Sequence, residues 1–77
     1  MNSELAIKAV ISEYERATSL HPRLHSPHEA YAVILEELDE LKAEVWKRHG
    51  LRDKQNMQME AIQVAAMAIR FLVDVTP

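Results

Sequence analysis

Apolar residues recur at helical spacing in three stretches of the chain, and polar segments separate the stretches. In the first stretch the apolar row consists of Ala6, Val10, Tyr14 and Ala17. Lysine, glutamate and arginine occupy the other side, which is the pattern of an amphipathic helix. The sequence predicts an all-α, single-domain chain whose three helices cover about residues 3–19, 27–48 and 54–75.

Local signals mark the ends of these helices. Ser26-Pro27 favours a helix start, because serine is a good N-cap and proline is preferred at the first helical position. Pro22 disfavours a helix in the residue before it. Gly50 is the expected C-terminal cap of the second helix, and Asp53 is the expected N-cap of the third.

Composition bears on how such a small chain is stabilised. Its 77 residues are 48% hydrophobic and include no cysteine, so neither a disulfide nor a cysteine-based zinc site is available. A core of this size is marginal on its own. Oligomerisation is the remaining common remedy, so we expect a homodimer or a homotetramer whose chains share a helical bundle.

Charge and hydropathy exclude several classes of protein. The net charge of −3 argues against nucleic-acid binding, which usually requires a basic surface. No run of about 18 apolar residues is present, so we expect no membrane span. The N-terminal residues lack the basic and apolar regions of a secretory signal. A cytoplasmic location is therefore the expectation.

Carboxylates accumulate between residues 36 and 44, inside the apolar pattern of the second helix. At about 100° per residue, Glu37 and Glu40 project together from the border of the apolar face. Glu60 and Gln63 repeat this spacing on the third helix. If the two helices pack side by side, four oxygen donors converge, and such ligands suit Mg²⁺.

A plainer interpretation of the same stretch is also open. Glutamate is a good and soluble helix former, so it can be abundant on a helix without binding a metal. Glu40 and Glu44 could then pair with Lys47 and Arg48 at helical spacing.

The order of these residues resembles a known family. Glu36-Glu37-x-x-Glu40, followed by Glu60 on the next helix, is similar to the motif of the MazG-type all-α nucleoside triphosphate pyrophosphohydrolases, E-E-x-x-E and then E-x-x-D. The resemblance covers most of the chain, from about residue 26 to residue 74. Gln63 departs from it, because the family has aspartate at this position.

The resemblance implies Mg²⁺-dependent hydrolysis of a nucleoside triphosphate to the monophosphate and pyrophosphate. By position, Glu37, Glu40 and Glu60 would bind the metal, and Glu36 would support catalysis by orienting a water or a ligand. The resemblance also implies dimers or tetramers with active sites inside the helical bundle.

The departure at Gln63 leaves two hypotheses. In the first, Gln63 is a weaker metal ligand, Glu44 is a possible accessory ligand, and Lys54 or Arg70 contacts phosphate. In the second, the chain is a non-catalytic helical oligomer that uses its alanine- and methionine-rich surface for assembly or partner binding.

Overall fold

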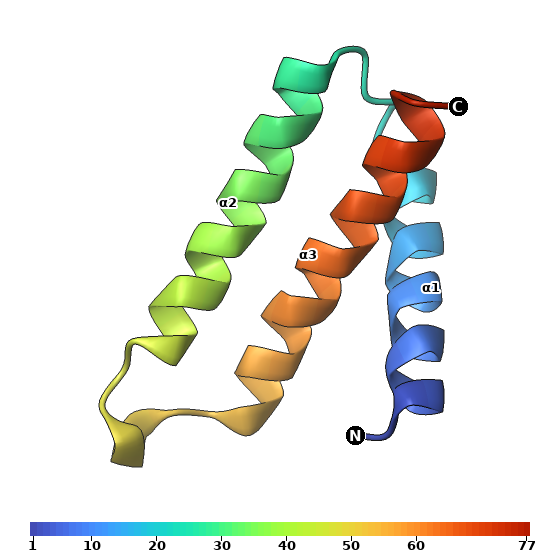
Figure 1. Cartoon of the computed structure of the whole chain (residues 1–77). Coiled ribbons are helices and arrows are strands. Elements are labelled where there is room, and N and C mark those ends of the chain that lie inside the picture. The colour runs from blue at the N-terminus through green and yellow to red at the C-terminus, as the bar shows by residue number, and fades with distance from the viewer.

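The computed structural model describes all 77 residues and contains helices but no strands, which confirms the all-α class. The elements are α1 (Ser3–Leu20), α2 (Pro27–Val45), the short 3-10 helix η1 (His49–Leu51) and α3 (Lys54–Asp74) (Figure 1). None of these helices combines the length and the apolar character that crossing a membrane requires.

α3 is the central element of the fold. It packs against α2 along one side and against α1 along another, whereas α1 and α2 make no close backbone contact with each other. Figure 1 shows α3 running between the other two helices, antiparallel to α2. The position of α1 relative to α2 is therefore set by α3 and by the loop between α1 and α2.

Side-chain caps fix the start of each α-helix. Asn2 accepts a hydrogen bond from the backbone N–H of Leu5 at 2.9 Å, and Ser26 accepts one from Glu29 at 3.1 Å. Asp53 accepts bonds from two backbone N–H groups of the first turn of α3. Each cap contributes about 1 kcal/mol, and the predicted starts of α2 and α3 are confirmed.

The end of α2 differs from the prediction. The helix stops at Val45 instead of continuing to Arg48, and Gly50 lies in η1 without a positive φ, so it is not a C-cap glycine. The reason is a contact from downstream: the Nε of Arg52 donates to the carbonyl of Val45 at 2.9 Å. This bond satisfies a carbonyl that the helix end would otherwise leave free.

The core is small. Ala17 and Ala66 are buried together with Met67, and the half-buried side chains around them are Val10, Tyr14, Val33 and Ile34. No large side chain is completely buried. Leu38, which lies four residues after Ile34 and would share its buried side in a regular helix, is 47% exposed.

One buried cation anchors the α1–α2 loop to α3. Arg70 is only 3% exposed, and its Nη2 donates to the carbonyl of Pro22 at 2.7 Å. Asp74, one turn later, accepts a bond from the backbone N–H of Leu24 at 3.0 Å. The guanidinium is both charged and buried, so the bond that it donates to Pro22 contributes more than a bond between neutral groups.

Replacing Arg70 by methionine should therefore lower the free energy of unfolding by about 1.5–3 kcal/mol, the usual contribution of a hydrogen bond from a charged group. Urea denaturation measures this loss. The matched control is Arg23→Met, because Arg23 also donates to a carbonyl of this region but is exposed. An equal loss in both variants would contradict the anchoring role of Arg70.

Candidate metal centre

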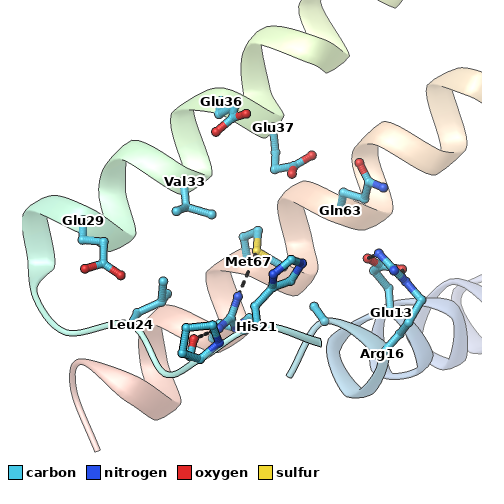
Figure 2. A pocket seen from close by; sticks show the side chains of 13 residues that line it. Glu13, Arg16, His21, Leu24, Glu29, Val33, Glu36, Glu37, Gln63 and Met67 are labelled. Atoms are coloured by element: carbon cyan, nitrogen blue, oxygen red, sulfur yellow. Dashed lines mark hydrogen bonds and ion pairs between the residues drawn. The ribbon is translucent and has the colours of Figure 1, made fainter. Parts of the chain in front are cut away.

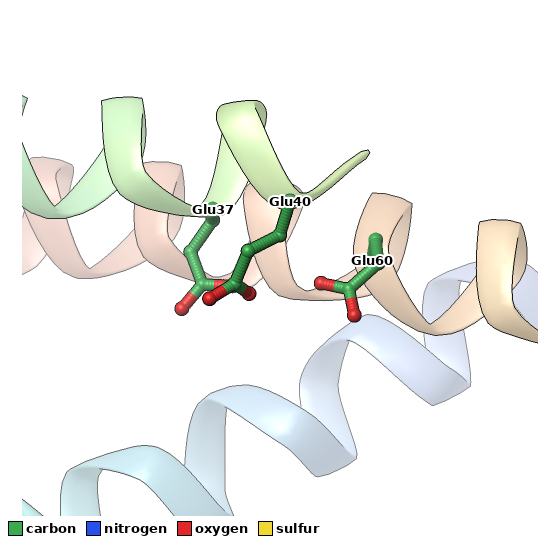
Figure 3. Close-up of side chains that lie close together, drawn as sticks. All are labelled: Glu37, Glu40 and Glu60. Atoms are coloured by element: carbon green, nitrogen blue, oxygen red, sulfur yellow. The ribbon is translucent and has the colours of Figure 1, made fainter. Parts of the chain in front are cut away.

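Three carboxylates from two helices meet at one place. Glu37 and Glu40 extend from α2 and Glu60 extends from α3, and one oxygen of each lies within 4.8 Å of the others. Figure 3 shows the three side chains pointing into the same space, on the side of α2 and α3 where α1 runs. Glu37 and Glu60 are half-buried, whereas Glu40 is exposed.

Helical spacing and the antiparallel packing of α2 on α3 produce this convergence. Residues three apart on a helix share a face, so Glu37 and Glu40 both reach the boundary with α3. α3 packs along this boundary and brings Glu60 to the same level. The two helices were predicted to bring four oxygen donors together, and the three carboxylates among them do converge.

Gln63, the fourth predicted ligand, contacts two of these carboxylates. The amide is best assigned with its nitrogen turned toward these carboxylates, and in that assignment the nitrogen donates to Glu37 Oε2 at 2.8 Å and to Glu60 Oε2 at 3.0 Å. The opposite orientation would place the amide oxygen against carboxylate oxygens. Gln63 therefore acts here as a donor that links α2 to α3.

Burial and mutual repulsion raise the pKa values of the cluster. Burial, followed by the negative charge of Glu40, raises the pKa of Glu37 to about 7. Burial, followed by a hydrogen-bonding contact with Glu40, also raises the pKa of Glu60. Near neutral pH Glu37 is therefore partly protonated, and a bound cation would displace this proton.

A cleft of about 320 Å³ adjoins the cluster and shares Glu37 and Gln63 with it. Figure 2 shows Glu36 and Glu37 on α2 with Glu13 and Arg16 of α1 across the cleft. The wall thus carries acidic groups on α2 and a guanidinium on α1.

Arg16 is paired within its own helix. Its Nε and Nη2 donate to the two carboxylate oxygens of Glu13 at 2.8 and 2.7 Å, and this bond lowers the pKa of Glu13. Neither residue was among the site candidates from the sequence. The three-residue spacing of Glu13 and Arg16 was the available signal, but it does not reveal which side of α1 faces the site.

The other predicted site residues lie in different surroundings. Glu36 is exposed on the cleft wall, and Glu44 lies outside the three-carboxylate cluster, paired with Lys47 at 2.6 Å. Arg70 lines the cleft but donates to a backbone carbonyl. Lys54 is exposed at the start of α3 and does not line the cleft.

No family model, curated protein or solved structure matches the chain. The resemblance to MazG-type enzymes therefore rests on the motif residues themselves, and it stays a prediction.

The raised pKa of Glu37 predicts a pH dependence of stability in the absence of divalent metal. Because this pKa lies at about 7 in the folded chain and ordinarily at 4.5, the folded state binds more protons between these values. The free energy of unfolding should fall as pH rises from about 5 to about 8. Urea denaturation in EDTA at both pH values measures the fall.

Glu37→Gln should reduce this fall, because the variant has no titrating group at that position. Glu15→Gln is the control, since Glu15 is exposed on α1 and lies outside the cluster. A fall of the same size in wild type and Glu37→Gln would show that Glu37 is not responsible.

Gln63→Asp tests the linking role of the amide. The variant removes two hydrogen bonds and adds a carboxylate, so the metal-free protein should lose about 1–3 kcal/mol of stability. Mg²⁺ should restore more stability in this variant than in wild type, because a fourth carboxylate increases the electrostatic affinity. Thermal unfolding of wild type and Gln63→Asp, with and without Mg²⁺, measures both effects. A metal-free variant that is more stable than metal-free wild type would contradict the linking role of Gln63.

Proposed function

We propose that the chain is a Mg²⁺-dependent nucleoside triphosphate pyrophosphohydrolase that acts in the cytoplasm and forms the monophosphate and pyrophosphate. The observation that carries the proposal is the convergence of Glu37, Glu40 and Glu60 within 4.8 Å beside a cleft of about 320 Å³. The order of these residues, which resembles the MazG-type motif except at Gln63, is a second support.

The donor set fits a hard divalent cation. Three carboxylate oxygens from two helices match the oxygen ligands that Mg²⁺ takes in proteins, with water completing its octahedron. The raised pKa values of Glu37 and Glu60 reflect burial and repulsion that a cation would relieve. Bound Mg²⁺ would supply positive charge that stabilises the charge developing on phosphate oxygens.

The residues around the cleft have separate roles in the proposed reaction. Glu36 projects from the cleft wall next to Glu37, where its carboxylate would orient a water molecule for attack on phosphorus. Arg16 and His21 line the same cleft, and Arg16 would bind phosphate oxygens by exchanging its two bonds to Glu13. Arg70 is buried, and its Nη2 is already bonded to the carbonyl of Pro22. It would therefore contribute positive charge from below the cleft surface and would not contact the phosphate directly.

A second candidate function is that of a non-catalytic helical oligomer. The observation that favours it is the position of Gln63, whose amide donates to Glu37 and Glu60 and thereby satisfies both carboxylates without a metal. In this case the acidic cluster would serve the packing of α2 on α3.

A pyrophosphate-release assay tests the catalytic proposal. The substrates are the four common ribonucleoside triphosphates and the four common deoxyribonucleoside triphosphates, each with Mg²⁺ and with EDTA. Wild type should release pyrophosphate only with Mg²⁺, and Glu40→Gln should reduce the rate by about 100-fold or more, as expected when a metal ligand is lost. The matched control is Asp39→Asn, which makes the same charge change on the outer side of α2.

The two candidates separate clearly in this experiment. Release that is equally reduced in Asp39→Asn would indicate a general effect of charge. Absence of release from every substrate, together with no heat of Mg²⁺ binding in calorimetry, would favour the non-catalytic oligomer.

A further inference from the structure

Positive charge is concentrated in the turn between α2 and α3 and in the helix ends beside it. We call this segment, residues 42–54, the basic end. It contains five of the nine lysines and arginines of the chain but only two of the twelve carboxylates, so its formal charge is +3. The rest of the chain then carries −6, because the whole chain carries −3. The basic residues are Lys42, Lys47, Arg48, Arg52 and Lys54, and the acidic ones are Glu44 and Asp53.

The basic end lies at one extremity of the molecule. Figure 1 shows η1 beyond the last turn of α2, at the opposite end of that helix from the α1–α2 loop. The bond from Arg52 Nε to the carbonyl of Val45 closes the turn at 2.9 Å, and Trp46 and Leu51 both lie within the closed segment. A flat surface can therefore contact the basic end while the opposite end of the chain stays away from it.

Two large apolar side chains project among these cations. Trp46 is 74% exposed and Leu51 is 68% exposed, and these are the highest values among the large apolar side chains of the chain. The Nζ of Lys42 lies over the Trp46 ring, 5.9 Å from its centre. Tryptophan and leucine beside lysine and arginine are typical of protein segments that lie in the interface of a membrane.

Much of the positive charge of the basic end is unpaired. No carboxylate lies within ion-pair distance of Lys42, Arg48 or Lys54, because the ion pairs of the chain involve other residues. The two carboxylates of the segment have partners already: Glu44 pairs with Lys47 at 2.6 Å, and Asp53 caps α3. The unpaired cations are therefore complementary to an anionic partner.

We infer that the basic end binds the surface of an anionic lipid membrane, with Trp46 and Leu51 among the headgroups and the cations against lipid phosphates and carboxylates. The negative potential of such a surface increases affinity by about fivefold for each lysine or arginine near it. Insertion of the two apolar side chains adds to this attraction. The contact is peripheral, because only the turn and the adjoining helix ends reach the lipid.

The exposed side chains favour lipid over a nucleic acid, the other common anionic partner. Single strands bind to proteins by stacking their bases on aromatic rings, and Trp46 is the single aromatic residue of the basic end. Leu51 has neither a ring for stacking nor a polar group for a base edge. A lipid surface, in contrast, accommodates both of these side chains together with the cations.

Membrane binding through the basic end is independent of the proposed function. The three carboxylates of the candidate metal centre lie outside residues 42–54. The binding experiments contain EDTA and no nucleotide, so that Mg²⁺ cannot link these carboxylates to lipid headgroups. Failure of membrane binding is therefore distinguishable from failure of the catalytic proposal, which pyrophosphate release tests.

Trp46 supplies the readout for the first experiment, because it is the only tryptophan of the chain. Vesicles of equal parts phosphatidylcholine and phosphatidylserine should shift its fluorescence emission to shorter wavelength, since the ring leaves water. Vesicles of phosphatidylcholine alone should leave the emission unchanged. High salt should reverse most of the shift, because it screens the attraction between the cations and the lipid.

Vesicle flotation of matched variants locates the contact. Arg48→Glu should weaken binding to the mixed vesicles by about 25-fold, because it changes two units of charge. Arg23→Glu makes the same change at the opposite end of α2 and should have little effect. Leu51→Gln should weaken binding by about 10-fold, whereas Leu20→Gln, at a side chain that is 62% exposed outside the basic end, should not. Circular dichroism shows whether each variant keeps its helices.

Three outcomes would overturn the inference. One is binding that is absent, or equal for the two kinds of vesicle. Another is an equal loss in Arg48→Glu and Arg23→Glu, which would indicate the net charge of the chain instead of the basic end. The third is an emission shift with a single-stranded oligonucleotide and none with the mixed vesicles, which would assign the basic end to nucleic acid.

Discussion

The packing of α2 against α3 forces negative charges together, and this repulsion is the constraint on which the site depends. Glu37 and Glu60 lie at the boundary of the two helices, where water screens their charges poorly. Two features offset the repulsion: the raised pKa of Glu37, which keeps this carboxyl partly protonated near pH 7, and the Gln63 amide, whose best assignment turns its nitrogen toward both carboxylates. A cation would offset the same repulsion more strongly, so the metal site proposed above is compatible with stable packing of α2 on α3 in its absence.

The local features of the fold could be predicted from the sequence because they depend on neighbouring residues. Ser26 and Asp53 cap their helices through bonds that span two or three residues. The pairing of Glu37 with Glu40 follows from helical spacing alone. The end of α2 could not be predicted in the same way, because the contact that stops it comes from Arg52, seven residues beyond Val45.

The remaining features depend on how the helices are rotated about their axes. The hydrophobic pattern of α1 is broad, and it does not show that Glu13 and Arg16 face the cleft. The same uncertainty applies to Leu38, because its spacing from Ile34 favours burial and the rotation of α2 nevertheless leaves it 47% exposed. Gln63 was expected to offer its oxygen to a metal, and only the positions of two carboxylates reveal that its nitrogen faces them.

Gln63 and Ala65 lie on nearly opposite sides of α3. A contact that fixes Ala65 against another helix would also fix the rotation of α3, and with it the distance from Glu60 to the carboxylates of α2. The small core within one chain leaves that rotation weakly determined, since no large side chain is completely buried.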